Sequence, residues 1–363
     1  MSIPDIAALT DRAVQILEPI RPDLLSADRR IALYGTGFLG SWAVDFLRAR
    51  GIEPVACYDG NTARHGTLFH GIPVSSPAAI TAETADFIFI TARHAVPQVS
   101  RVLEGTGVAH ASLDAWYAAT HLADFVEIHN LLDDDRSRET LRAVLLAMLS
   151  GEARPCHLVV ERDQYFCLPA FAGAAREVYV DAGAYVGDSI ERFIWANAGV
   201  FDRIHGFEPG ARQFAALSSR CDRLTREWAL GEEQIKLISS GLGNRSFVTA
   251  AGSASGLLQS LSLSDAGHGG DTDVSIVSLD AYLHGERITF LKADVEGMEM
   301  ALLEGAAETI RSHRPKLAIC VYHYPSDIPA LAGYIRSLVP EYRLALRHHS
   351  PQLMETVLYC WVD

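Results

Sequence analysis

Short apolar runs alternate with segments of helical periodicity along most of the chain, in two separate series. The first series begins with predicted strands at Ile31–Tyr34, Pro54–Tyr58 and Asp86–Ile90, and a helix is predicted over Ser41–Ala49. Strands that alternate with helices indicate parallel sheets of the α/β type. The pattern fades near Trp116.

The second series is longer and starts after a change in pattern. Its predicted strands are Glu177–Asp181, Asp202–Glu208, Ile235–Ser239, Ile288–Asp294, Lys316–Val321, Tyr342–Leu346 and Glu355–Trp361. The last two runs are joined by a short polar connection, which predicts a terminal antiparallel hairpin. We therefore expect an α/β protein of two doubly wound domains, the second with one antiparallel strand.

The segment between the two series has a different character. His121–Leu132 and Ser137–Leu149 predict two amphipathic helices separated by an acidic turn. We interpret residues 121–175 as a helical connector between a domain of residues 1–120 and a domain of residues 176–363, and expect no chemistry in it. Gly252–Gly270 is rich in glycine and serine without a period, which predicts a mobile loop.

Composition agrees with two globular domains and excludes several classes of protein. The chain has 363 residues, 49% hydrophobic and 21% charged, where a domain takes about 150 residues. A net charge of −14 argues against nucleic-acid binding. The six cysteines show no paired spacing, which favours reduced thiols. Without a signal-peptide pattern, or the roughly 18 apolar residues of a membrane span, we expect a cytoplasmic protein, which could form a homo-oligomer.

A first glycine motif follows the first predicted strand. Gly35, Gly37 and Gly40 open a helix, and Asp59 ends the next strand. Glycines at this spacing permit close approach of a pyrophosphate to the helix N-terminus, and Asp59 could accept hydrogen bonds from ribose hydroxyls. The motif indicates a Rossmann-like domain with a nucleotide-type ligand, or one that has lost its ligand and docks a partner domain or substrate. The histidines here are interpreted as surface or capping residues: His65, His70 and His94.

A second glycine motif follows the strand that ends at Asp181. Here the acid precedes the glycines, which suits a positively charged ligand such as S-adenosylmethionine. Asp181 could hold the ammonium of this ligand directly or through water, while Gly183 and Gly187 let the backbone approach it. Glu208, at the end of the next strand, could accept both ribose hydroxyls. The further candidate cofactor contacts are Tyr185, Ser189, Ser240 and Gly241.

Candidate catalytic residues follow the later strands. Lys292 and Asp294 share one face of their strand, and Glu296 joins them if the extended geometry persists. We expect Asp294 and Glu296 to border the methyl donor, and the alternative for Lys292 is an ion pair with one of these acids. His323 follows the fifth strand, where it could act as a general base or be a hydrogen-bonded structural histidine.

Two further interpretations concern side chains near these groups. Glu296 and Glu299 could serve only as acids near a helix N-terminus. Arg347–Ser350 could touch substrate, but we interpret it as a solvated turn.

These blocks together resemble the FkbM family of S-adenosylmethionine-dependent methyltransferases. The matching text is Val180–Asp188, Gly206–Pro209, Leu291–Gly297, Val321–His323, Val339–Tyr342, Arg347–His348 and Glu355–Tyr359. The resemblance covers residues 160–363 and implies a class I methyltransferase fold, usually with O-methylation of a hydroxyl on a sugar, glycan or polyketide-like acceptor. Tyr185 stands where broader methyltransferases often carry glycine. The text Tyr58–Asn61 and His70–Val74 resembles small nucleotide-binding domains fused to sugar-modifying transferases.

The sequence thus predicts an S-adenosylmethionine-dependent O-methyltransferase of a small-molecule or glycan acceptor. Asp294 and His323 are the predicted catalytic residues, with His323 as the general base. No metal is predicted, although a divalent ion bridging Asp294 and Glu296 stays open. The alternatives are an NAD-dependent sugar oxidoreductase using Gly35–Gly40 and a scaffold protein that senses ligands. The motif in which Asp181 precedes the glycines favours the methyltransferase, because NAD sites do not need an acid at that position.

Overall fold

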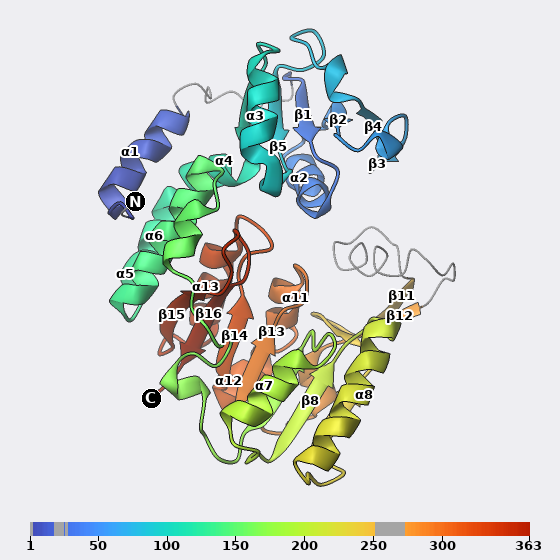
Figure 1. The fold of residues 1–363 in the computed structure, drawn as a ribbon, viewed down its shortest axis with the longest axis vertical. Helices are drawn as coiled ribbons and strands as arrows, with labels where there is room; N and C mark the ends of the chain where they lie inside the picture. Colours follow the sequence, from blue (N-terminus) through green and yellow to red (C-terminus); the bar gives the residue numbers. More distant parts are fainter. Residues whose placement is uncertain (1–2, 18–24, 26–27, 251–272) are drawn as a thin grey trace.

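Two sheets stand at the two ends of the molecule, with a group of helices running between them (Figure 1). The computed structural model describes residues 3–17, 25, 28–250 and 273–363. The predicted Gly252–Gly270 loop lies outside these residues. Helices of the first part of the chain are α1 (Ile6–Leu17), α2 (Phe38–Arg48), α3 (Val96–Glu104), α4 (Leu113–Thr120), α5 (Leu122–Leu131) and α6 (Asp135–Ser150). The 3₁₀ turns are η1 (Thr62–Arg64), η2 (Pro77–Ala79), η3 (Arg93–Ala95), η4 (Arg154–Leu158) and η5 (Pro169–Phe171).

The first sheet has the order β3-β4-β2-β1-β5-β6. Its strands are β1 (Ile31–Tyr34), β2 (Ala56–Tyr58), β3 (Leu68–Phe69), β4 (Ile72–Ser75), β5 (Phe87–Ile90) and β6 (Ala109–Ser112). The three predicted strands are its parallel centre, since β1 pairs with both β2 and β5. The sequence missed β3, β4 and β6, which are short or weakly apolar. Helix α2 begins at Phe38 rather than at the predicted Ser41.

The second sheet has the order β15-β16-β14-β13-β7-β8-β9. Its strands are β7 (Val178–Ala182), β8 (Arg203–Phe207), β9 (Ile235–Ile238), β13 (Phe290–Ala293), β14 (Lys316–Cys320), β15 (Arg343–His348) and β16 (Thr356–Trp361). Only β16 runs antiparallel to its neighbours, which confirms the terminal hairpin and the class I methyltransferase topology. A small sheet that was not predicted holds β10 (Gly241–Leu242), β11 (Phe247–Ala250) and β12 (Asp273–Val277). The helices of this domain are α7 (Asp188–Ala196), α8 (Ala211–Glu227), α10 (Leu279–Leu283), α11 (Glu299–Glu304), α12 (Ala307–His313) and α13 (Asp327–Leu338).

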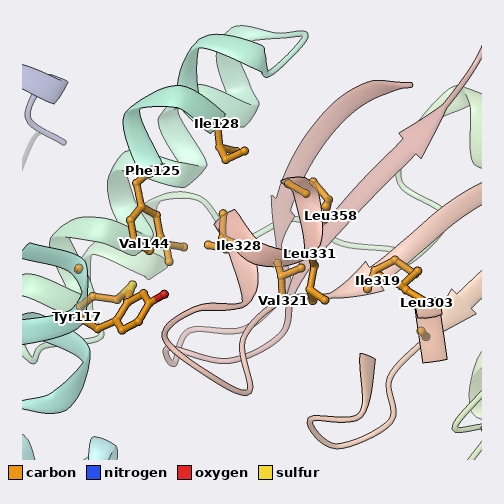
Figure 2. Close-up of a cluster of buried hydrophobic side chains, with 14 of the residues drawn as sticks. Tyr117, Phe125, Ile128, Val144, Leu303, Ile319, Val321, Ile328, Leu331 and Leu358 are labelled. Atoms are coloured by element: carbon orange, nitrogen blue, oxygen red, sulfur yellow. The ribbon is translucent and has the colours of Figure 1, made fainter. Parts of the chain in front are cut away.

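The connector helices join both domains through a shared apolar core. Helices α5 and α6 lie close to the two predicted segments, and α6 begins where the Asp134 carboxylate accepts the backbone N–H of Ser137 at 2.8 Å. Figure 2 shows Phe125 and Val144 from these helices near Ile328 of α13 and Leu358 of β16. One cluster of buried side chains extends from Ile31 to Leu358, so burial of apolar surface holds the two sheets together.

The hairpin residues predicted as a solvated turn are buried instead. Arg347 is 8% exposed and His348 fully buried, because β15 packs against the start of α6. The Arg347 guanidinium lies 3.1 Å from the Asp134 carboxylate and donates to the Ser137 hydroxyl at 2.6 Å. Burial lowers the pKa of His348 to about 4, so this histidine is neutral and structural. The prediction of a solvated turn at Arg347–Ser350 was wrong.

Two predictions from composition can be compared with the structure. All six cysteines are free thiols, as their spacing suggested. Among the described residues, no helix combines the length and the apolar character needed to span a membrane.

Candidate active site

A cavity of about 520 Å³ opens at the carboxyl ends of β7, β8 and β13. From β7 the sheet continues to β8 and β9 on one side, while β13 and β14 lie on the other. The strand order therefore reverses between β7 and β13, and ligands of open α/β sheets bind at such a point. Predicted site residues that line the cavity are Gly183, Tyr185, Ser189, Glu208, Gly241 and Asp294. Asp181, Gly187, Ser240 and His323 do not line it.

Asp181 is fully buried behind the cavity wall. Its carboxylate accepts a hydrogen bond from the Ser189 hydroxyl at 2.5 Å and lies 3.0 Å from Lys292 Nζ. Both partners line the cavity, so Asp181 faces them rather than the open space. The ion pair expected between Lys292 and Asp294 or Glu296 is thus formed with Asp181 instead.

Lys292 is a buried cation that joins two strand ends. Its ammonium donates to the carbonyl of Gly183 at 2.7 Å and to that of Ala182 at 3.2 Å. Burial lowers the pKa of Lys292, but the charges of Asp181 and Asp294 outweigh burial, and the pKa lies above its ordinary value. Burial raises the pKa of Asp181, and the Lys292 charge opposes this effect. The lysine therefore presents a fixed positive charge at the cavity wall.

Gly183 is required by the packing of the protein itself. Its φ of +75° lies in the left-handed region, and a Cβ here would lie 1.8 Å from the Asp294 carbonyl oxygen. Gly187 has a similar internal reason, since its Cβ would meet the Leu217 side chain at 2.9 Å. The sequence motif identified two positions that require glycine. Close contacts within the protein are enough to explain both glycines without a ligand.

Glu208 is held in place by the two loops beside it. One carboxylate oxygen accepts the backbone N–H of Tyr185 at 3.0 Å, and the other accepts that of Gly210 at 2.7 Å. The side chain lines the cavity although the residue is only 7% exposed, and burial raises its pKa. Each oxygen keeps a free lone pair for a further donor. The Tyr185 side chain, at 57% exposure, covers the mouth of the cavity.

Asp294 lines the cavity directly after the end of β13. Its carboxylate accepts hydrogen bonds from the hydroxyls of Tyr165 at 3.0 Å and Tyr322 at 3.3 Å. Burial raises the pKa of Asp294, but the charges of Lys292 and His323 outweigh it and lower the pKa below its usual value. Asp294 is therefore ionised at neutral pH.

Extended geometry does not persist beyond Asp294. Strand β13 ends at Ala293, and Glu296 has a φ of +54°. Glu296 nevertheless lines the cavity. The neighbouring Glu299 accepts the Val295 backbone N–H at 2.9 Å. This contact lies at the start of α11, in agreement with the alternative that Glu299 is an acid near a helix N-terminus.

Several lining residues were not assigned a role from the sequence, and those near Asp294 include Gln164, Tyr165, Tyr322 and Glu355. Tyr322 and Glu355 stand inside the blocks that carry the family resemblance, so their position was a usable signal. Gln164 and Tyr165 belong to the segment interpreted as a connector without chemistry. Tyr165 and Asp294 are 129 positions apart in the sequence, so no local sequence pattern could predict their hydrogen bond.

His323 lies among three carboxylates just behind this end of the cavity. Its ring nitrogens are 3.2 Å from Glu299, 3.6 Å from Glu296 and 3.7 Å from Asp294. Burial lowers the pKa of His323, yet these charges outweigh burial and raise the pKa well above its usual range. The ring is thus an imidazolium at neutral pH, whereas a general base must be neutral. This geometry favours Asp294 over His323 as the proton acceptor.

The same cluster bears on the open question of a metal. Ligand atoms of Asp294, Glu299 and His323 lie within 4.8 Å of one another, which is close enough for one cation. The protonated His323 already supplies a positive charge there, so the negative charge of the carboxylates is partly neutralised without a metal ion.

The first glycine motif forms a second cavity of about 700 Å³, lined by Gly35, Gly37 and Asp59. The Asp59 carboxylate accepts hydrogen bonds from the backbone and hydroxyl of Thr36 and from the backbone N–H of Asn61 at 2.8 Å. It therefore braces its own loop, where a ribose contact was expected. Gly40 packs against the loop, since its Cβ would lie 2.6 Å from the Gly35 carbonyl oxygen.

The three histidines interpreted as surface or capping residues lie near the surface of this domain. His65 hydrogen-bonds to the Asp59 carbonyl and His70 to the Ser41 hydroxyl, while His94 is exposed.

Comparison with known proteins identifies the second domain. Residues 181–348 match the family model of the methyltransferase FkbM domain. The structure is similar to that of a methyltransferase FkbM from Methylobacillus flagellatus KT, with a TM-score of 0.58 and 24% sequence identity over 98% of this chain and all of that chain. This likeness shows a shared fold across both domains. No curated protein matches the chain.

Other solved structures match more weakly. An rRNA methylase from Streptococcus thermophilus has 19% identity and a TM-score of 0.34 over 53% of this chain and 92% of its own. Aeropyrum pernix fibrillarin, solved with S-adenosyl-L-methionine, has 16% identity and a TM-score of 0.32 over 62% and 76%. The family match and the fold agree: residues 181–348 match the methyltransferase FkbM domain, within a chain that has the fold of a solved FkbM methyltransferase.

Proposed function

We propose that the chain is an S-adenosylmethionine-dependent O-methyltransferase that acts on a hydroxyl of a sugar, glycan or similar natural-product acceptor. One observation carries the proposal: a single cavity is lined by the anchored Glu208 carboxylate, which follows β8, and by the ionised Asp294 carboxylate, which follows β13 on the other side of β7. The first suits the ribose of the cofactor, and the second suits the hydroxyl that receives the methyl group.

The residues of the cavity fit this cofactor. Its volume of about 520 Å³ lies within the range of roughly 300–1,000 Å³ for small-molecule sites. Glu208 would accept both ribose hydroxyls, and Gly241 would lie beside the adenine. Ser189 and Lys292, both held by Asp181, would contact the methionine part. The bound cofactor supplies a methyl group on a positively charged sulfur, which an oxygen nucleophile can displace in line.

Asp294 has the position and charge to orient the acceptor and take its proton. The hydroxyls of Tyr165 and Tyr322 hold the carboxylate in one orientation, which aligns the acceptor oxygen. As that oxygen gains a methyl group it becomes positively charged, and its proton becomes strongly acidic. A carboxylate with a lowered pKa can therefore accept the proton. His323, as a cation 3.7 Å from Asp294, positions this carboxylate and keeps it ionised.

The NAD-dependent alternative has weaker support. It requires Asp59 to accept ribose hydroxyls, whereas one Asp59 oxygen already accepts two hydrogen bonds from Thr36 and the other accepts one from Asn61. Glu208, by contrast, accepts one hydrogen bond at each oxygen. The cavity at the first motif suits a ligand that does not depend on the Asp59 carboxylate.

Calorimetric titration with S-adenosylhomocysteine tests the cofactor assignment. Glu208→Gln removes the charge that holds the ribose, and hydrogen bonds to charged groups contribute about 1.5–3 kcal/mol, or roughly 10- to 150-fold in affinity. Glu232→Gln is the matched control, because Glu232 is exposed. We expect binding to fall in the first variant and to stay unchanged in the second. Binding of NADH without binding of S-adenosylhomocysteine would overturn the proposal.

A further inference from the structure

The cavity of the first glycine motif reaches a residue of the other domain that lies beside Asp294. Its lining includes the Gly35–Phe38 loop and also His323, which lies 3.7 Å from Asp294. A neighbouring cavity of about 650 Å³ between the domains is lined by Phe38, His323, Glu296 and Tyr322. Glu296 and Tyr322 also line the cofactor cavity. Neighbouring cavities thus share lining residues, and the series of three leads from the glycine loop to Asp294.

Aromatic contacts fix the two domains at this junction. Phe38 and Trp42 of α2 both stack on Tyr324, at centroid distances of 5.1 and 5.6 Å, and Phe38 meets His323 edge-on at 6.1 Å. In Figure 1, α2 lies on the side of its domain that faces α11 and β13. The glycine loop is therefore held next to the catalytic loop by packing.

The chemistry of the first-motif cavity suits an anion. Gly37 is the N-cap of α2, and no side chain caps this helix end. A helix N-terminus with free backbone N–H groups attracts phosphate. Basic side chains lining the cavity are Arg64, Arg93 and His94, against one acid, Asp59, whose oxygens accept hydrogen bonds from the loop. The Arg93 guanidinium pairs with the Asp114 carboxylate at 2.7 Å, so an anion would be met by Arg64 and the helix N-terminus.

His323 provides an independent sign of a ligand. The residue is only 6% exposed, and neither ring nitrogen has a hydrogen-bond partner within the described residues. The carboxylates around it pair with its charge but do not meet hydrogen-bond geometry. Since His323 lines the same cavity as the glycine loop, a ligand extending from that loop could supply the missing acceptor.

We propose that the Gly35–Phe38 loop binds a diphosphate carried by the methyl acceptor, and that the hydroxyl-bearing part of this acceptor extends past His323 to Asp294. The substrate class is a sugar joined to a nucleoside diphosphate. A diphosphate on another carrier shares this chemistry, and the experiment below separates the two. The inference rests on the proposed function, because it identifies the ligand as the methyl acceptor.

Gly37→Leu blocks the subsite without disturbing the fold. Gly37 has a φ of −91°, which any residue can adopt, and a Cβ built there meets nothing within 4 Å. The leucine side chain therefore enters open space in front of the helix N-terminus. Gly333→Leu is the matched control, because Gly333 is exposed on α13 and its Cβ is equally unobstructed. Unfolding curves of both variants check that the chain is intact.

Calorimetry on the full chain saturated with S-adenosylhomocysteine measures binding of uridine, cytidine, guanosine, adenosine and thymidine diphosphates and of inorganic pyrophosphate. We expect at least one nucleoside diphosphate to bind, Gly37→Leu to weaken it by tenfold or more, and Gly333→Leu to leave it unchanged. Arg64→Gln should weaken the same probe. Pyrophosphate binding as tightly as every nucleoside diphosphate would keep the diphosphate subsite and overturn the nucleoside carrier.

The remaining outcomes separate this inference from the proposed function. If S-adenosylhomocysteine binds but none of the diphosphates does, the inference fails while the methyltransferase assignment stands. Diphosphate binding that Gly37→Leu does not weaken would also overturn it, as would binding of NADH in place of every diphosphate. Failure of S-adenosylhomocysteine to bind the wild-type chain would instead remove the proposed function and with it the acceptor assignment.

Discussion

Replacing Lys292 by methionine should destabilise the methyltransferase domain strongly, because it leaves Asp181 buried without its counter-charge. Both side chains are almost completely buried, at 2% and 0% exposure, and their charged atoms lie 3.0 Å apart. Methionine has nearly the volume of lysine, so little cavity is created. The loss of stability therefore measures the cost of the unpaired charge on Asp181, which keeps the Ser189 hydroxyl as a hydrogen-bond donor.

The expected size follows from other buried pairs. Removing one partner of a buried ion pair costs about 3–5 kcal/mol, whereas replacing both is often close to neutral. For a domain of this size 1 kcal/mol corresponds to about 2–4 °C, so Lys292→Met should lower the melting temperature by roughly 6–20 °C. Asp181→Asn should cost less, since Lys292 retains the carbonyl oxygens of Ala182 and Gly183 as acceptors. The double variant should recover much of the loss.

The pH dependence gives a second readout of the same charge. In Lys292→Met, burial without a cation raises the pKa of Asp181 in the folded state above its unfolded value of about 3.9. A group with a raised folded pKa contributes stability at low pH and loses it as the pH rises through that pKa. The deficit of the variant relative to wild type should therefore shrink as the pH falls from 8 to 5.

Urea unfolding and calorimetry of the four members of this cycle test the argument. Lys236→Met is the matched control, because Lys236 is an exposed lysine on β9 of the same sheet, and it should change stability by less than about 1 kcal/mol. A loss below 1 kcal/mol for Lys292→Met would refute the reasoning. So would single-variant losses that add within about 0.5 kcal/mol in the double variant, since additivity means the two charges do not interact.

Four further outcomes follow from the site. Gly183→Ala should destabilise the domain by about 2–4 kcal/mol, from a left-handed backbone and a clash with the Asp294 carbonyl; a urea midpoint equal to that of wild type would contradict this. Asp294→Asn should keep S-adenosylhomocysteine binding in calorimetry but slow methyl transfer by about 10²-fold or more, and unchanged turnover would remove the base assignment. Since the pKa of His323 is raised, its charge stabilises the fold at low pH and is lost only as the pH rises through that pKa, so unfolding should become easier at high pH and His323→Gln should flatten that dependence. Dialysis against a chelator should leave binding and turnover unchanged, and a loss restored by a divalent ion would place a metal at Asp294 and His323.

Strands with strongly apolar runs were predictable from the sequence, and weaker ones were not. Phe87–Ile90 is buried throughout, and such a run has few alternatives to a central strand. The edge strand β6 (Ala109–Ser112) carries alanine, histidine and serine, and its pairing with β5 comes from position in the fold. The solvated turn predicted at Arg347–Ser350 failed for a related reason, because Arg347 finds a partner on α6 and the two histidines find partners in other segments of the chain.

Residues of the site divide in the same way. Asp181 and Glu208 stand at strand ends beside glycine motifs, so topology alone brings them to one edge of the sheet. Tyr165 reaches Asp294 from another segment of the chain, and only the folded chain shows it. The protonation of His323 was equally hidden, because it depends on Glu296 and Glu299, whose distances from the ring are set by the turn after β13.

The charge distribution explains why an anionic acceptor would need a subsite away from the catalytic end. Four carboxylates surround His323: Asp294, Glu296, Glu299 and Asp327. They crowd each other enough that burial and the Glu299 charge raise the pKa of Asp327 to about 7. A diphosphate placed among them would meet strong repulsion in a region of low dielectric constant. At the N-terminus of α2 the same group meets free N–H groups and Arg64. The sites are close enough for one molecule to reach both, since Phe38 beside Gly37 contacts His323 beside Asp294. A substrate that combines an anionic end with a neutral hydroxyl-bearing end matches both environments, and a substrate with charge at its reacting end matches neither.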